Sequence, residues 1–194
     1  PEICEYVSTE FYEGKLKTEE RCEKREISGV GNGLFWVDAN HKEECVNQSQ
    51  EEAGIVKQVI NDLMNQTFHK YDDQTRERVE VSLKEDDFVI VTPYNAQRHL
   101  ILNTLSEKFP KIKVGTVDDF QGKEAPVVIY SMATTSRDLV PPGRGDFIYK
   151  ANRLNVAVRR AQCLAIVVAN RALVEAHASN ISEMKDMNHL CRIF

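Results

Sequence analysis

The sequence VVIYSM at residues 127–132 contains no charged side chain, and its first three residues are β-branched. A short apolar run without alternation is typical of a strand that is buried on both faces, as in a parallel sheet. Similar short runs occur on both sides of it, namely LFWV (34–37), FVIV (88–91), VGTV (114–117) and LAIVV (164–168). The chain therefore carries five candidate buried strands.

Helical patterns separate these runs. Ser49 followed by Glu52 predicts a capping box, and the apolar residues after it recur at helical spacing, so we expect a helix over residues 50–67. Further helices are expected around residues 100–109, closed by Pro110, around 151–160, and over 172–178, capped by Asn170. Apolar strands that alternate with amphipathic helices predict an α/β fold with a doubly wound parallel sheet flanked by helices. Ligands of such folds bind outside the carboxyl ends of the strands.

The organisation of the chain follows from the same patterns. We expect residues 34–194 to form a single domain and residues 1–33 to be a loosely packed, acidic N-terminal connector. Residues 69–87 are polar and give no clear pattern, whereas Pro141, Pro142 and Gly143 predict a loop over residues 138–146.

Composition excludes several classes of protein. The 194 residues are 42% hydrophobic and 28% charged, as in ordinary soluble globular proteins. No apolar run approaches the roughly 18 residues of a membrane span, and the N-terminus has no signal-peptide pattern. Five cysteines without a CxxC pair indicate a reducing, cytoplasmic setting. Because the first residue is Pro1 rather than methionine, we expect that the chain is a piece of a longer protein.

Charge is distributed unevenly along the chain, whose formal net charge is −5. Residues 1–92 contain 11 Lys and Arg against 21 Asp and Glu, whereas residues 93–170 contain 11 against 6. A basic section in an acidic chain fits a local site for the phosphates of a nucleotide or nucleic acid. Chance clustering of solvated surface charge is the alternative, and composition leaves both open.

Three polar segments beside the predicted strands are candidates for a site. They are TPYNAQ (92–97), TVDDFQGKE (116–124) and RLNVAVRRA (153–161). Taken singly, each has a structural interpretation: a turn that leads into a helix, a surface turn, and a solvated pair of arginines. Their order and their positions at strand ends favour a common function.

Other chemistries find little support in the sequence. The five histidines are scattered, so no metal site is predicted. There is no GxSxG elbow and no Cys/His pair for nucleophilic catalysis. The sequence also lacks a G-x-x-x-x-G-K-[ST] phosphate loop, so this chain alone does not cradle a triphosphate in the Walker manner.

Taken together, the segments FYEGKL, TPYNAQ, VGTVDDFQGKEAPVVIYSM and NRLNVAVRRAQ resemble the second RecA-like domain of superfamily 1B helicases. The chain is most similar to the regulator-of-nonsense-transcripts helicases, senataxin and bacterial RecB-like nuclease–helicase fusions. The resemblance covers essentially the whole chain. It implies a RecA-like fold without its own phosphate loop, which closes over ATP bound mainly by a first RecA-like domain.

The resemblance also implies residues for the nucleotide. Arg160 matches the arginine finger that reaches the γ-phosphate, and Gly122 and Glu124 match residues that approach the γ-phosphate through the backbone and hold the ribose. These roles suit a glycine, which lets main-chain amides approach a phosphate, and a carboxylate, which accepts from ribose hydroxyls. Arg153 lies two helical turns before Arg160 and is assigned a supporting role at the same cleft.

A second set of residues is implied for the backbone of a single strand. Thr92, Tyr94 and Thr116 match the family's contacts to nucleic acid, and hydroxyls and main-chain amides suit phosphate contacts that carry no sequence information. Gln97 is expected to tie its loop to the 116–124 segment. Asp118 is expected to hold the turn of that segment.

The chain departs from the family in two places. Arg159 stands where the family usually has Thr or Ser, so either Arg159 or Arg160 is available as the finger, and the motif favours Arg160. The family's other finger lies in a Tyr-Arg-Met-His segment directly before the region that corresponds to residues 11–16. We expect that segment to lie just upstream of Pro1.

The leading hypothesis is the C-terminal motor domain of an ATP-dependent helicase or translocase. It would use ATP and Mg²⁺ in the full-length protein, and this chain alone would bind neither and hydrolyse no ATP. Its partners would be the first RecA-like domain of the same polypeptide and single-stranded nucleic acid, with DNA favoured over RNA and no membrane. The alternatives are a non-catalytic nucleic-acid-binding or scaffold module derived from such a motor, and a self-contained α/β hydrolase or transferase, which lacks a nucleophile.

Overall fold

Five parallel strands form the central sheet of the computed structural model, which describes residues 1–72, 75, 77–120, 122–139, 151–178 and 181–194. Their order across the sheet is β2-β8-β7-β5-β6, and every neighbouring pair is parallel. The strands are β2 (Gly33–Asp38), β5 (Phe88–Val91), β6 (Lys113–Gly115), β7 (Ala125–Ser131) and β8 (Ala161–Ala169). All five strands predicted from the sequence are present, and the predicted fold class is confirmed.

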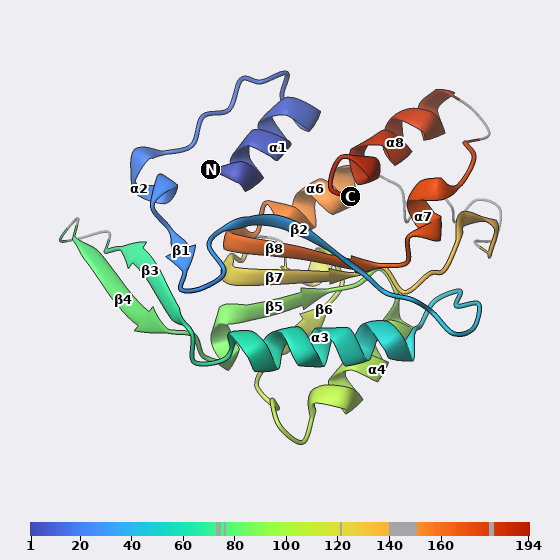
Figure 1. Cartoon of the computed structure of the whole chain (residues 1–194), viewed down its shortest axis with the longest axis horizontal. Coiled ribbons are helices and arrows are strands. Elements are labelled where there is room, and N and C mark those ends of the chain that lie inside the picture. Colours follow the sequence, from blue (N-terminus) through green and yellow to red (C-terminus); the bar gives the residue numbers. More distant parts are fainter. Residues whose placement is uncertain (73–74, 76, 121, 140–150, 179–180) are drawn as a thin grey trace.

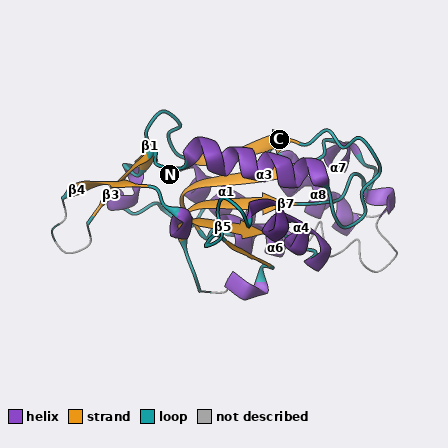
Figure 2. Ribbon diagram, turned by 90° about the horizontal axis from the view of Figure 1, so that it is seen from below, coloured by secondary structure: helices purple, strands orange, loops and turns teal. Residues whose placement is uncertain are grey.

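Helices cover both faces of this sheet (Figures 1 and 2). Side chains alternate between two buried clusters, so that Val127 and Ile129 of β7 join one and Val128 and Tyr130 the other. The first cluster contains side chains from α3 (Gln50–Leu63) and α4 (Asn95–Leu105), and the second contains side chains from α1 (Glu2–Phe11), α6 (Ala151–Val158) and α8 (Ile181–Cys191). Because β5, β7 and β8 contribute buried side chains to both clusters, the sequence of each reads as one continuous apolar run.

The N-terminal segment contains more structure than the sequence predicted. Helix α1 packs on β2, β8 and α6, and Val7 is buried in the second cluster. The buried carboxylate of Glu10 accepts a 2.6 Å hydrogen bond from Nδ1 of His189 in α8 and contacts Arg192. The spacing of Ile3, Tyr6, Val7 and Phe11 is helical and was the available signal. Residues 2–11 are therefore not loosely packed, whereas the domain boundary at residue 33 stays a prediction.

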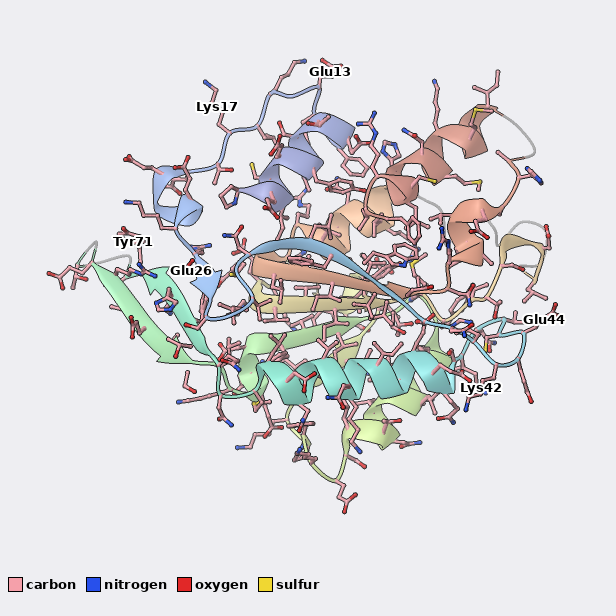
Figure 3. The ribbon with its side chains drawn as sticks, viewed as in Figure 1. Glu13, Lys17, Glu26, Lys42, Glu44 and Tyr71 are labelled. Carbon is pink, nitrogen blue, oxygen red and sulfur yellow. The ribbon has the colours of Figure 1, made fainter. Side chains whose placement is uncertain are left out.

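A small antiparallel sheet occupies the region that the sequence left open. It consists of β1 (Glu26–Ile27), β3 (Thr67–Tyr71) and β4 (Arg78–Ser82) in the order β1-β3-β4. It lies at the amino ends of the main strands, where Figure 3 shows Glu26 and Tyr71. Because Asn65 adopts a positive φ of 68° and the chain then enters β3, α3 ends at Leu63 rather than at the predicted residue 67.

The remaining elements are short. They are α2 (Glu20–Glu23), the 3-10 turns η1 (Glu85–Asp87), η2 (Asp118–Phe120) and η3 (Arg137–Leu139), and α7 (Ala172–Glu175). The Oδ1 atom of Asn170 accepts from the amide of Ala172 at 2.9 Å, so the predicted cap of this helix forms although the helix is only four residues long. Helix α8 was not predicted. Most of the predicted loop at 138–146 lies outside the described residues.

Candidate nucleotide and nucleic-acid sites

The segments before β7 and β8 lie side by side at the amino ends of these two neighbouring strands. The amide of Ala125 donates a 3.0 Å hydrogen bond to the carbonyl oxygen of Arg160, and Ala125 is in register with Ala161. This pairing places Glu124 close to Arg160, since each directly precedes one of the paired residues. Gly122, Glu124 and Arg160 all precede their strands, so they lie toward the amino ends and not at the carboxyl ends where ligands of such folds were expected.

Gly122 and Glu124 are both accessible to a ligand. Gly122 has a positive φ of 81°, a conformation that favours glycine, and no atom lies within 4 Å of the position that a Cβ would take. The exposed Glu124 carboxylate has one side-chain partner among the described residues, a 3.5 Å contact with the Nε2 atom of Gln162. The backbone and the carboxylate are therefore open to phosphate and ribose.

The two adjacent arginines differ in their surroundings. Arg159 is exposed, and its Nη1 atom donates a 3.0 Å hydrogen bond to the hydroxyl of Tyr12. Arg160 is half-buried, and its Nε atom is buried without a hydrogen-bond partner among the described residues. Arg159 and Glu124 also line a cavity of about 710 Å³ that α1, α2 and the start of β8 enclose. Arg159 is thus tethered to Tyr12, whereas the Nε–H of Arg160 is left unsatisfied.

Arg153 lies within electrostatic reach of Tyr130 in β7. Its positive charge acts on Tyr130, where it opposes the effect of burial, which raises the pKa of the phenol well above its ordinary value. Tyr130 is five residues along β7 from Ala125, about 16 Å at the rise of a strand. Arg153 stands near the first turn of α6 and Arg160 follows its end, so the two arginines lie toward opposite ends of that helix. The supporting role of Arg153 at the same cleft as Arg160 stays a prediction.

The 116–124 segment connects the two ends of the sheet. It begins after the carboxyl end of β6 and ends at the amino end of β7, with β5 between these strands. Val117 and Phe120 are buried in the cluster on one face of the sheet, so the segment crosses that face. This one segment therefore links Thr116 at the carboxyl ends of the strands to Glu124 at the amino ends.

Thr92, Tyr94 and Thr116 follow β5 and β6 and therefore lie at the carboxyl ends. Thr92 is fully buried, and its hydroxyl is 3.5 Å from the amide of Tyr94, so its side chain supports the turn and is not available to a ligand. Tyr94 is half-buried, and its hydroxyl lies 3.3 Å from the hydroxyl of Thr134. Thr116 is half-buried, and both its amide and its hydroxyl donate to Oδ2 of Asp119, at 2.7 and 3.0 Å.

Two supporting roles differ from the expectation. Asp119, not Asp118, holds the turn of the 116–124 segment, and its two hydrogen bonds to Thr116 lower the pKa of its carboxyl. Gln97 is fully buried and bonds to Ser49 and Ser131 rather than to that segment. Both side chains are structural, as expected, but their partners are set by contacts between distant segments.

Two searches of the described residues were negative. They hold no group of three or more His, Cys, Asp or Glu side chains placed for a metal ion. Among the same residues, no helix is both long and apolar enough to span a bilayer.

Comparison with known proteins identifies the family. The sequence profile of a family described as "AAA domain" matches residues 1–172. The chain belongs to this family. The matched residues include every candidate site residue at both ends of the sheet.

The relatives of this AAA domain are of the superfamily 1 helicase type, and so is the chain. It is 33% identical over 100 residues to "DNA-binding protein SMUBP-2" of Rattus norvegicus, which covers 52% of this chain and 10% of the relative. It is 28% identical over 195 residues to "DNA polymerase alpha-associated DNA helicase A" of Schizosaccharomyces pombe. This match covers 89% of this chain and 27% of the relative. A "Regulator of nonsense transcripts 1 homolog" of Neurospora crassa is 25% identical over 196 residues. This match covers 91% of this chain and 16% of the relative. The AAA domain thus spans about a quarter or less of the length of each of these relatives.

Proposed function

We propose that this AAA domain is the second RecA-like motor domain of an ATP-dependent helicase or translocase that acts on single-stranded nucleic acid, with DNA favoured. The observation that carries the proposal is the hydrogen bond between Ala125 and Arg160, because it brings the backbones of Glu124 and Arg160 to one corner of the sheet, at the amino ends of β7 and β8. The names of the relatives, which include a DNA helicase and a DNA-binding protein, support the choice of substrate.

In this proposal the chain supplies half of an ATP site. Bound ATP would place the reacting γ-phosphate at this corner and supply the bond that is hydrolysed. The residues present fit a phosphate and a ribose, since the Gly122 backbone is open, Glu124 is exposed and the Nε–H of Arg160 lacks a partner within the described part of the chain. The guanidinium of Arg160 would stabilise the charge that develops during phosphoryl transfer, and Glu124 would accept hydrogen bonds from ribose hydroxyls. The phosphate loop and the Mg²⁺ ligands would come from a first RecA-like domain of the same polypeptide.

Nucleic acid would bind at the carboxyl ends, where Tyr94 and Thr116 lie. Contacts to sugar and phosphate suffice for a motor that moves along any sequence. Thr92 acts in this proposal only through its buried turn before Tyr94. The 116–124 segment connects Thr116 at the nucleic-acid end to Glu124 at the nucleotide end. A conformational change at the nucleotide end could therefore be transmitted through this segment to the bound nucleic acid.

The proposal is tested in a polypeptide that joins this domain to its first RecA-like domain. We expect ATP hydrolysis that single-stranded DNA stimulates, with a higher KM for ATP after Glu124→Ala and a lower kcat after Arg160→Ala. A complete gene product without a phosphate-loop motif, or one in which neither change affects hydrolysis, would instead favour a non-catalytic nucleic-acid-binding module. Gln162→Ala is a matched control, since it removes the partner of Glu124 and leaves the carboxylate in place.

A further inference from the structure

A buried carboxylate lies at the carboxyl ends of the main strands, outside the sites described so far. Glu52 stands in the first turn of α3 and is 0% exposed. Its Oε2 atom accepts a 2.6 Å hydrogen bond from the hydroxyl of Ser131 and a 2.9 Å hydrogen bond from the amide of Ala133. Its Oε1 atom is 3.1 Å from Nε2 of His41, whose side chain is also fully buried. A buried charge is tolerated when it is paired and hydrogen-bonded in this way.

Only half of the predicted capping box forms, which shows that the side chain of Glu52 has another role. The hydroxyl of Ser49 accepts from the amide of Glu52 at 3.1 Å, as in the motif. In a complete box the glutamate would accept from the amide of Ser49, but that amide donates to Oε1 of Gln97 at 2.8 Å. Glu52 turns inward to Ser131 and Ala133 instead.

Glu52 fixes the chain where it leaves β7. Ala133 has a positive φ of 62°, a left-handed conformation that is unfavourable for a residue with a side chain. Its amide donates to Glu52, which holds this turn in place. The hydroxyl of the next residue, Thr134, donates its one proton to the carbonyl oxygen of Val46 at 2.8 Å and lies 3.3 Å from the hydroxyl of Tyr94.

The same network reaches the start of α4, which directly follows Tyr94. Gln97 lies in the first turn of this helix, and its Nε2 atom donates to the hydroxyl of Ser131 at 3.0 Å and to the carbonyl oxygen of Ser49 at 3.2 Å. The hydroxyl of Ser131 thus accepts from Gln97 and donates to Glu52. Tyr94 is therefore connected to Glu52 along two routes, through Gln97 and through Thr134.

His41 completes the network on the side of the loop after β2, where Figure 3 shows Lys42 and Glu44. A carboxylate only accepts, so Nε2–H of His41 donates to Glu52. The Nδ1 atom of His41 lies 2.8 Å from the hydroxyl oxygen of Thr135, which also accepts from the amide of Cys45 at 2.8 Å. The network therefore extends from Glu52 through His41 and Thr135 to Cys45.

We propose that Glu52 is a positioning residue for the nucleic-acid-binding end of this domain: by holding Ala133 and Ser131, it sets where Tyr94 and Thr134 stand for a bound strand. The inference rests on the proposed function, since it assumes that a strand binds at the carboxyl ends. Although Glu52 is fully buried, its role would be measured as the affinity of the domain for single-stranded nucleic acid.

The test compares two buried carboxylates by substitution to glutamine. Glu52→Gln keeps the size of the side chain but replaces one acceptor oxygen with an NH₂ group, which is a donor. The hydrogen bond to His41, or those to Ser131 and Ala133, would then bring two donors together and be lost. Glu10 is the matched control, because its side chain is 4% exposed and holds His189 far along the chain from this network. The probe is a fluorescently labelled oligothymidylate, and anisotropy is recorded at low salt with protein up to hundreds of micromolar, since weak non-specific binding lies at about 10⁻⁴–10⁻⁶ M.

We expect Glu52→Gln to raise the Kd for the oligonucleotide at least fivefold while circular dichroism stays unchanged. Glu10→Gln should lower the melting temperature and leave Kd within twofold of wild type. If Glu52→Gln does not fold, Ser131→Ala decides the question, since it removes one donor and should raise Kd two- to threefold.

Three outcomes overturn the inference. One is a folded Glu52→Gln protein with wild-type Kd, and another is a Ser131→Ala protein with wild-type Kd when Glu52→Gln fails to fold. The third is a loss of affinity in Glu10→Gln equal to that in Glu52→Gln, which would mean that general destabilisation explains both. If wild-type protein binds no oligonucleotide under these conditions, the proposed strand site itself is wrong, and the inference falls with it.

Discussion

The amide of Ala125 and the carbonyl oxygen of Arg160 are joined by a 3.0 Å hydrogen bond, although 35 residues separate them along the chain. The bond lies where β7 and β8 begin to pair, beside the register pair of Ala125 and Ala161. It holds the backbone of Arg160 next to the residue that follows Glu124. The relative position of Glu124 and Arg160 is therefore set by the pairing of β7 with β8.

The roles of the two adjacent arginines are separable by substitution. In the two-domain polypeptide, we expect Arg160→Ala to reduce the rate of ATP hydrolysis by about 10³–10⁵-fold, the scale for arginine fingers, with little change in nucleotide affinity. Arg160→Lys should recover little, because an ammonium does not reproduce the planar fork of a guanidinium. Steady-state phosphate release and nucleotide titration measure both quantities.

Arg159→Ala is the control for this prediction. Arg159 is bound to Tyr12, so its loss should cost much less turnover and should be matched by Tyr12→Phe, which removes the same hydrogen bond. An inactive Arg159→Ala protein beside an active Arg160→Ala protein would place the finger one residue earlier.

The isolated chain should not hydrolyse ATP. Its sequence has no phosphate loop, and half of a cleft supplies neither the P-loop lysine nor the Mg²⁺ ligands. Phosphate release with ATP, Mg²⁺ and single-stranded DNA should stay at background. Turnover that follows the protein through every purification step would contradict this expectation.

Binding of the isolated chain to single strands should be weak and sensitive to salt. The net charge of −5 opposes binding, and the basic section at residues 93–170 provides few phosphate contacts. Anisotropy titrations between about 50 and 200 mM salt should show the affinity falling steadily, as counterion release requires. Tight binding that does not change with salt would indicate contacts other than those to phosphate and would favour the scaffold alternative.

Cys163 should resist alkylation in the folded protein. Burial raises the pKa of its thiol to about 12, so almost none is thiolate at pH 8, and only 2% of the residue is exposed. We expect iodoacetamide at pH 8 to label the exposed Cys191 first and Cys163 only after unfolding, as read by mass spectrometry. Rapid labelling of Cys163 under native conditions would show that the start of β8 opens readily.

The same pKa shift predicts how stability changes with pH. The thiolate is favoured in the unfolded chain, where the pKa is near 9.0, so this thiol makes the unfolding free energy fall as pH rises from about 9 toward 12. Cys163→Ala should remove that part of the pH dependence. Urea unfolding at pH 8 and pH 10 gives the change of the unfolding free energy with pH in the wild-type and Cys163→Ala proteins. An equal change in both proteins would contradict the role assigned to this thiol.

The apolar runs of the sequence determined the main sheet, since a strand that is buried on both faces must be apolar along its whole length. The motifs predicted a common role for Gly122, Glu124 and Arg160, and the pairing of β7 with β8 brings the backbones of Glu124 and Arg160 close to each other. Local patterns also indicated the cap at Asn170. In each case the signal lies within a few consecutive residues, because burial and capping act over one or two turns of chain.

Only the tertiary structure decided which partners the buried polar side chains have. Glu52 reads as part of a capping box but binds Ser131, Ala133 and His41. Gln97 bonds to Ser49 and Ser131, and the charge of Arg153 acts on Tyr130. The orientation of such a side chain depends on which hydrogen-bonding groups from distant parts of the chain lie next to it in the folded domain. That space is created when α3, α4 and β7 pack together, and no pattern of neighbouring residues encodes it.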